Sequence, residues 1–337
     1  MKISSKIGLA LLLGPLLLPL GGCGCGFDCN NNGNDSNPAL LTLGLSDAVP
    51  EDLKQVVIRV DKITFKRTGA EDVVVDRFTI DELGLVDVDT FQVDLLKYQG
   101  VNQLRVIQNL SLDPGTYSAV SITIIADGIN NSYVQEDNDL LKAITVTGGV
   151  LNLPGMQLAS GAQPFTIEFS LAQALQATTA EYRLSATGIR VENNLTAATL
   201  SGKVDSQLFN SVTPCSEKAT PTAGNRVYLY KGTGIASSRL ADVYTSASVT
   251  TPPANAVAPF AVASLVVNPL TGNWEYASGF VPAGTYTLAF ACDTQNDDAV
   301  EYNGLTITIP LPVDQIYTVS LAAGKNGTCN LAPGGSC

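Results

Sequence analysis

The sequence of 337 residues contains no histidine. This absence excludes nucleophilic sites of the Ser-His-Asp and Cys-His types, because they need an imidazole that titrates near neutral pH. It also excludes most catalytic zinc sites and the C-x-x-C-H haem motif. Any chemistry of this chain therefore rests on carboxylates, amides, hydroxyls, thiols, amines and aromatic rings.

Basic residues are scarce as well. The chain has 19 Lys and Arg residues against 31 Asp and Glu residues, a formal net charge of -12. A nucleic-acid partner needs clustered Lys and Arg to neutralise phosphates, so we expect none. The acidic excess is typical of a solvated surface.

Long apolar runs are also missing. The longest run, residues 7–20 (IGLALLLGPLLLPL), is interrupted by Pro15 and Pro19 and is short for a membrane-spanning helix. Because Lys2 and Lys6 precede it, residues 1–22 are predicted to be a secretory signal peptide. The chain is not expected to span a membrane.

The segment Leu20-Gly21-Gly22-Cys23 resembles the bacterial lipobox, in which the cysteine sulfur is diacylated and the cysteine becomes the mature N-terminus. Two or more acyl chains give stable anchoring where one does not. The alternative is an ordinary signal peptide followed by a cysteine-rich tail. Gly24 follows in place of Asp, as in lipoproteins sent to the outer membrane, so we predict an outer-membrane lipoprotein facing either the periplasm or the surface.

Residues 23–38 are rich in Asn, Gly and Ser and have too few apolar side chains to form a core. The composition predicts a flexible tether between the lipid and the folded part of the chain.

Seven cysteines are present, and lipidation of one leaves an even number in an oxidising compartment. Cys25 and Cys29 are close enough to pair within the tether. The other four allow three connectivities; two disulfides are predicted among them, and the pairing is left open. All six are disulfide candidates: Cys25, Cys29, Cys215, Cys292, Cys329 and Cys337.

Residues 39–195 alternate between short runs rich in β-branched residues and turn signals such as Asp113-Pro114-Gly115. Expected strands include residues 56–60, 73–75, 118–125, 144–146, 165–169, 182–186 and 189–191. Short helices are expected at residues 93–99 and 171–177. This spacing favours an antiparallel β-sandwich over βαβ units.

Residues 196–337 repeat the pattern, with expected strands at 200–209, 226–231, 262–267, 273–279, 285–292, 305–311 and 316–321. Seven strands suit an immunoglobulin-like or transthyretin-like sandwich. We therefore predict an all-β protein with two antiparallel sandwich domains in tandem, residues 39–195 and 196–337. The segment 112–117 (LDPGTY) is similar to the segment 281–286 (VPAGTY). In each, a tight turn is expected directly before a tyrosine that begins a strand.

Residues 43–50 (LGLSDAVP) resemble the opening of a family of bacterial lipoprotein domains of unknown function. The resemblance continues at residues 91–100, 112–117, 165–169 and 182–191, and so covers most of residues 40–195. Val49 departs from the family pattern by standing between Ala48 and Pro50. The family has no assigned catalytic residues, so the resemblance implies none here.

Residues 198–325 are similar to carboxypeptidase-regulatory-like, transthyretin-like modules. The similarity lies at residues 202–204, 226–230, 272–276 and 282–286. It implies a sandwich that serves as a structural or interaction unit.

Four acidic residues crowd the segment DTQNDDAVEYNG: Asp293, Asp297, Asp298 and Glu301. Carboxylates at this spacing provide the oxygen ligands that calcium prefers. The segment departs from an EF-hand, because Asp298 replaces the glycine and Gly304 replaces the final glutamate. The segment nevertheless predicts calcium as a cofactor. The alternative is a solvated acidic loop that binds no ion.

Asp87, Asp89 and Asp94 alternate with valines, a pattern typical of the wet face of an edge strand. The enzyme motifs G-x-S-x-G and G-x-x-x-x-G-K-[ST] are missing. Trp274, the single tryptophan, shares its half of the chain with several tyrosines, and their alternation favours core positions over a sugar-stacking surface.

These features predict a lipid-anchored envelope lipoprotein that acts as a non-catalytic binding, adhesion or structural module. Its partners would be the membrane, through the N-terminal lipid, and an envelope protein or a glycan. Two alternatives stay open: a histidine-independent, carboxylate-based glycan-active enzyme, and an assembly subunit that pairs through an exposed edge strand.

Overall fold

The structure is a computed structural model that describes residues 37–48, 53–244, 252–297, 302–304, 306–335 and 337. The predicted signal peptide, Cys23, Cys25, Cys29 and Val49 lie outside the described residues.

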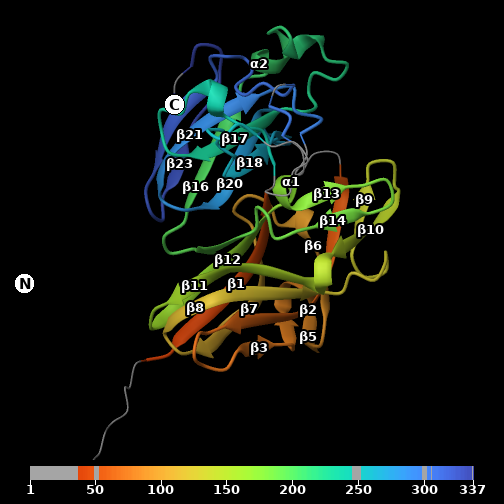
Figure 1. Cartoon of the computed structure of the whole chain (residues 1–337), viewed down its shortest axis with the longest axis vertical. Coiled ribbons are helices and arrows are strands. Elements are labelled where there is room, and N and C mark those ends of the chain that lie inside the picture. Colours follow the sequence, from red (N-terminus) through yellow and green to blue (C-terminus); the bar gives the residue numbers. More distant parts are fainter. Residues whose placement is uncertain (1–36, 49–52, 245–251, 298–301, 305, 336) are drawn as a thin grey trace, which may run out of the picture. The chain divides into compact units, whose positions relative to one another are not determined.

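The first half of the chain is built from fifteen strands among the described residues (Figure 1). They are β1 (Ala39–Ala48), β2 (Leu53–Lys66), β3 (Val73–Val75), β4 (Phe78–Ile80), β5 (Leu85–Val88), β6 (Phe91–Asp94), β7 (Leu104–Leu112), β8 (Gly115–Ile124), β9 (Tyr133–Glu136), β10 (Leu141–Val146), β11 (Val150–Leu158), β12 (Gly161–Ser170), β13 (Leu175–Ala177), β14 (Tyr182–Leu184) and β15 (Arg190–Asn193).

These strands form two large sheets and a small one. One large sheet has the order β15-β12-β1-β7, and the other has the order β11-β8-β2-β9-β10-β14-β13 with β3 and β6 also paired to β2. The short strands β4 and β5 pair with each other. In Figure 1, β12, β1 and β7 lie side by side in that order. A single buried cluster, which includes Leu43, Phe65, Ile122 and Phe169, fills the first half.

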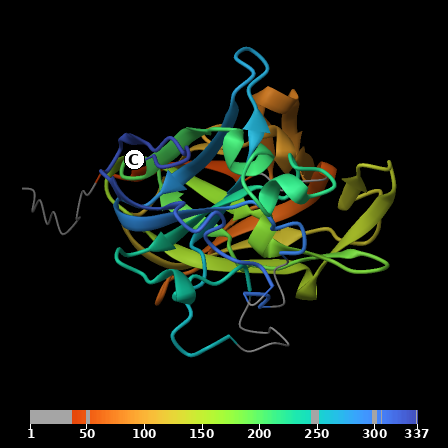
Figure 2. The ribbon, with the colours of Figure 1, turned by 90° about the horizontal axis from the view of Figure 1, so that it is seen from above.

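The second half contains eight strands among the described residues. They are β16 (Ala198–Val204), β17 (Arg226–Lys231), β18 (Ala261–Ser264), β19 (Val266–Val267), β20 (Trp274–Val281), β21 (Gly284–Ala291), β22 (Ile316–Leu321) and β23 (Asn326–Thr328). Their two sheets have the orders β19-β20-β16-β23 and β18-β17-β21-β22. The hairpin that joins β19 and β20 stands clear of the sheets (Figure 2, light blue).

The strands β17 and β21 are buried on both faces. Val227, Leu229, Leu288 and Phe290 contribute to the cluster between the two sheets. Their sequence neighbours, including Tyr228, belong to a second cluster beneath the loops. Double-sided burial explains why β17 is a nearly continuous apolar run in the sequence.

Helices are few and short. They are α1 (Leu171–Ala174) and α2 (Gln207–Asn210), with 3-10 turns at η1 (Asp81–Leu83), η2 (Leu95–Lys97), η3 (Thr147–Gly149), η4 (Cys215–Glu217) and η5 (Ser237–Arg239). Within the described part of the chain, no helix has the length and apolar character that crossing a membrane requires.

The all-β fold class predicted from the sequence is confirmed. Strands β3 and β17 match their predicted ranges residue for residue. Three strand pairs nevertheless run parallel: β1 with β12, β10 with β14, and β16 with β23. Alternation of apolar residues predicts a strand but not its direction relative to a neighbour.

Two expected strands are wrong in part. The strand predicted at 200–209 ends at Val204, because the Asp205 carboxylate accepts the N–H of Gln207 at 2.9 Å and a short helix follows. The strand predicted at 305–311 is not formed in its described part, where only a bridge joins Ala291 to Leu311. Pro310 and Pro312 lack the N–H that a strand ladder needs.

The expected helices are shorter than predicted. Residues 93–99 form the end of β6 and the turn η2, whose start is capped by the Asp94 carboxylate accepting the N–H of Leu96. Residues 171–177 form α1 and then strand β13.

Candidate functional site

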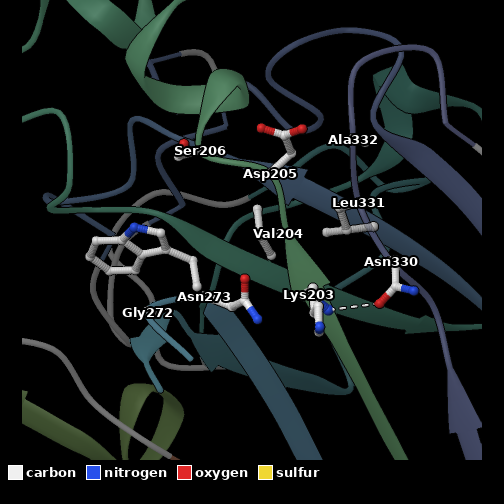
Figure 3. A pocket seen from close by; sticks show the side chains of 10 residues that line it. Lys203, Val204, Asp205, Ser206, Gly272, Asn273, Asn330, Leu331 and Ala332 are labelled. Atoms are coloured by element: carbon white, nitrogen blue, oxygen red, sulfur yellow. Dashed lines mark hydrogen bonds between the residues drawn. The ribbon is translucent and has the colours of Figure 1, made fainter. Parts of the chain in front are cut away.

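A pocket of about 450 Å³ opens where β16 ends. It is lined by three segments that are distant in the sequence, residues 203–206, 272–274 and 330–332. In Figure 3, Asn273 and Asn330 lie on opposite sides of the strand that carries Lys203 and Val204. The strand register agrees, because Val204 pairs with Trp274 on one side and bridges to Leu331 on the other.

Backbone hydrogen bonds fix the pocket wall. Asp205 donates its N–H to the carbonyl oxygen of Leu331, and Leu331 donates its N–H to that of Lys203, both at 2.8 Å. The Oδ1 atom of Asn330 accepts the N–H of Lys203 at 2.9 Å, the bond drawn in Figure 3. The wall is therefore formed before any ligand binds.

Trp274 contributes the apolar part of the lining. The indole is half-buried, and its ring centre lies 5.4 Å from that of the fully buried Phe209, with the ring planes at 80°. Val204 and Leu331, its neighbours across the sheet, are buried. The position of the indole is thus set by core contacts.

The predicted calcium residues lie elsewhere. Asp297 is buried, and its carboxylate accepts the hydroxyl of Tyr228 at 2.5 Å and the N–H of Val243 at 3.0 Å. Arg226 lies 3.4 Å from the same carboxylate. Burial, followed by the charge of Asp297, raises the pKa of Tyr228 well above its usual value. Asp297 therefore belongs to a buried polar network in the second half.

Of the other three acidic residues of that loop, the structure describes one. Asp293 is exposed, whereas Asp298 and Glu301 lie outside the described residues. No group of three or more Cys, Asp or Glu side chains in the described ranges has metal-binding geometry. The calcium site stays a prediction.

Two disulfides are present among the described residues, as predicted for the four cysteines of the second half. Cys215 pairs with Cys292, with Cα atoms 5.6 Å apart, and Cys329 pairs with Cys337, with Cα atoms 4.5 Å apart. Cys329 directly precedes Asn330, so the loop that the second disulfide closes contains the lining residues Asn330, Leu331 and Ala332.

The three alternating aspartates have separate structural roles. Asp87 and Asp89 form exposed ion pairs with Arg77. This contact lowers the pKa of Asp87. Asp94 caps η2 and accepts the N–H of Val56 at 3.2 Å. The structure does not bring the three together as a site.

A buried carboxylate that the sequence did not single out lies on β12. Glu168 is fully buried, and neither of its oxygens has a hydrogen-bond partner among the described residues. The nearest charge is Arg190, whose Nη2 atom is 4.0 Å from Oε1. Burial raises the pKa of Glu168 to about 7, and Arg190 opposes that rise.

Contacts between the halves explain this burial. β1 contacts β18 and β20, and β15 contacts β20, so the outer face of the β15-β12-β1-β7 sheet is covered. The guanidinium of Arg190 lies 4.8 Å from the ring centre of Phe260, and the amine of Lys231 lies 4.4 Å from it. Gln173 also donates to the carbonyl oxygen of Pro259 at 2.9 Å. Glu168, Arg190 and Gln173 are buried in this contact, whereas Phe260 is half-buried and Lys231 is exposed at its edge.

The repeated turn makes the same tyrosine hydrogen bond in both halves. Tyr117 donates its hydroxyl to the carbonyl oxygen of Asp113, four residues earlier, and Tyr286 does so to Pro282. Residues 112–117 lie inside the region that a family model matches. Residues 38–186 match DUF4382, a domain of unknown function.

The DUF4382 segment spans β1 to β14 and confirms the resemblance of the first half to a domain of unknown function. The pocket over β16 lies beyond it. The similarity of residues 198–325 to carboxypeptidase-regulatory-like modules stays a prediction. None of the curated proteins compared matches the sequence.

Solved structures show only weak similarity. A leucine-rich repeat protein from Bacteroides thetaiotaomicron aligns over 88% of this chain and 26% of its own, with 10% identity and a TM-score of 0.22. The TIE protein of Bacillus anthracis aligns over 88% of this chain and 34% of its own, with 9% identity and a TM-score of 0.18. This chain therefore spans about a quarter and about a third of their lengths.

The minor pilin GBS52 of Streptococcus agalactiae aligns over 86% of this chain and 94% of its own, with 12% identity and a TM-score of 0.19. TM-scores this low carry no information about the fold. The fold of both halves is therefore described from the strands of this chain alone.

Little in the sequence points to the pocket. Trp274 stands out as the single tryptophan, but no motif marks Asn273, Asn330 or Asp205. Their segments are separated by about 70 and 60 residues of chain, so no local pattern joins them. The parallel register of β16 with β23 and the bridge to Leu331 bring the third segment to the site.

Proposed function

We propose that this chain is a lipid-anchored envelope lipoprotein that acts as a non-catalytic binding, adhesion or structural module. The pocket at the end of β16 carries the binding part of the proposal. Its wall is fixed by backbone hydrogen bonds, and amide, carboxylate and indole groups line it. A preformed pocket of about 300–1,000 Å³ with a few placed polar groups is the usual form of a small-ligand site.

The anchoring part rests on the sequence. The apolar run at residues 7–20 and the lipobox-like Leu20-Gly21-Gly22-Cys23 support acylation of Cys23. Residues 23–38 would then join the lipid to β1. The outer membrane is the proposed location.

The non-catalytic part is supported by the composition of the pocket. Hydrolysis of a glycan by carboxylates needs two of them, roughly 5–10 Å apart across the reacting bond. Among the described residues that line the pocket, Asp205 is the single carboxylate. One of its oxygens already accepts the N–H of Gln207.

Acyl labelling tests the anchor. The full-length chain, expressed in a Gram-negative host fed labelled palmitate, is expected to carry label and to sediment with outer membranes. Cys23→Ser should abolish the label, whereas Cys25→Ser should keep it. Label that persists in Cys23→Ser would contradict the proposed anchor.

Incubation with oligosaccharide and peptide substrates tests the absence of catalysis. The purified protein is expected to leave every substrate intact by mass spectrometry. Turnover that Asp205→Asn abolishes would overturn the non-catalytic assignment and favour the glycan-active enzyme.

A further inference from the structure

The side chains around the pocket hold polar groups that the protein itself does not use. The Oδ1 atom of Asn330 accepts a hydrogen bond from the N–H of Lys203, and the Oδ1 atom of Asp205 accepts one from the N–H of Gln207. Within the described part of the chain, the Nδ2 group of Asn330 and the side-chain amide of Asn273 have no hydrogen-bond partner. A carboxamide offers two N–H donors and one acceptor, so both residues present donors, and the bond at Oδ1 fixes the orientation of the Asn330 amide.

Trp274 adds a flat apolar surface with one N–H donor. Its contact with Phe209 restrains the ring. The buried side chains of Val204 and Leu331 lie at the same end of the sheet. An immobile aromatic ring binds with little loss of side-chain entropy. The lining therefore combines a stacking surface with amide donors and an acceptor.

The charges of the lining balance. Lys203 and Asp205 are the charged residues among the described lining, one of each sign. The chain as a whole has a net charge of -12, which opposes the approach of anions. The pocket therefore favours a neutral ligand with many hydroxyl groups over a phosphate or a carboxylate.

We propose that this pocket binds a neutral carbohydrate. A sugar ring presents C–H groups on a face, which suit the indole of Trp274, and hydroxyls at its rim, which suit Asn273, Asn330 and Asp205. The inference rests on the proposed binding function and names its ligand class. The volume of about 450 Å³ suits a short segment of a glycan, with the remainder extending into solvent.

The test uses the mature chain on a printed array of neutral and anionic oligosaccharides, followed by calorimetry with the neutral sugar that binds most strongly. Trp274→Ala is expected to weaken that binding by about 10-fold or more, because the sugar loses the apolar ring face against which it packs. Asn273→Ala is expected to weaken it by about 3–10-fold through a lost hydrogen bond.

Asn326→Ala is the matched control, because Asn326 is exposed on β23 and does not line the pocket. Thermal unfolding of each variant separates binding from folding, and Asn273→Ala keeps the test decisive if Trp274→Ala unfolds. Three results would overturn the proposal: no neutral sugar binds, only anionic sugars bind, or binding is unchanged in both Trp274→Ala and Asn273→Ala. Acyl labelling and incubation with substrates still report on the broader function in each case.

Discussion

The hydroxyl of Tyr286 donates a hydrogen bond to the carbonyl oxygen of Pro282, four residues earlier, at 2.7 Å. Tyr117 makes the same bond to the carbonyl oxygen of Asp113 at 3.1 Å. Both tyrosines are buried, and both follow a glycine-containing turn into a core strand. The short sequence echo between the halves is thus also a repeated structural corner of the kind found in β-sandwiches.

Removal of either hydroxyl should destabilise the fold. Tyr286→Phe and Tyr117→Phe are each expected to lower the free energy of unfolding by about 1 kcal/mol, because a part-buried hydrogen bond is lost. Urea unfolding measures this change. Tyr133→Phe is the control, since the hydroxyl of Tyr133 is half-buried and its bond to Gln55 is 3.3 Å long. Equal effects in all three variants would argue against a special role for the corners.

The buried carboxyl of Glu168 should make stability depend on pH. Its pKa is about 7 in the fold against a usual value of 4.5. The folded state therefore holds the proton more tightly, and the contribution to stability is full below about pH 4.5 and is lost as the pH rises through about 7. Between pH 5 and pH 8 the free energy of unfolding is expected to fall by up to about 3 kcal/mol.

Glu168→Gln tests this pH dependence. The amide cannot ionise, so the variant is expected to match the wild type near pH 5 and to exceed it in stability at pH 8. Urea unfolding at several pH values measures both curves. Glu217→Gln is the control, because Glu217 is exposed. A slope with pH that survives in Glu168→Gln would show that another group is responsible.

The two disulfides should differ in their effect on stability. The Cys215–Cys292 bond spans 77 residues, and the Cys329–Cys337 bond spans 8. From loop entropy, replacing the first pair with serines is expected to cost about 4.5 kcal/mol, and replacing the second about 2.5 kcal/mol. Thermal unfolding ranks the two variants. Non-reduced peptide maps should contain these two linkages, and a Cys215–Cys329 peptide would contradict the pairing.

The network around Asp297 should be essential for the second half. Asp297→Ala leaves Arg226 and Tyr228 without this carboxylate in a buried site, so a loss of about 3 kcal/mol is expected. Asp293→Ala, an exposed neighbour, should change stability by less than about 0.5 kcal/mol. Equal losses in both variants would contradict the structural role of Asp297.

The same protein preparations test the calcium prediction. Calorimetric titration of the wild type with calcium is expected to show heat if the loop binds the ion, and Asp293→Ala should reduce it. No heat in the wild type would contradict the calcium site and leave the buried network unaffected.

Local patterns in the sequence were enough to predict individual strands and corners. The apolar run at Arg226–Lys231 forms β17, and the turns before Tyr117 and Tyr286 form as expected. Backbone preference and the alternation of side chains act over a few residues, so they can be read from neighbours in the chain. The number of disulfides followed from counting cysteines.

The tertiary structure decided which distant segments meet. Alternation in β12 does not show that Thr166 and Glu168 are buried. The Thr166 hydroxyl donates to Gln103 and Asn194, and strands of the second half contact β1 and β15, the neighbours of β12. Strand direction and cysteine pairing also depend on where each strand ends in space. The pocket joins Lys203, Asn273 and Asn330 through the pairing of β16 with its neighbours.

The absence of histidine by itself limited the chemistry of this protein to oxygen, sulfur, amine, amide and aromatic groups. It did not say where those groups converge. Convergence depends on long-range strand register, which is set by burial of whole faces and is not contained in any short stretch of sequence. For this reason the class of fold came from the sequence, whereas the position and lining of the pocket came from the folded chain.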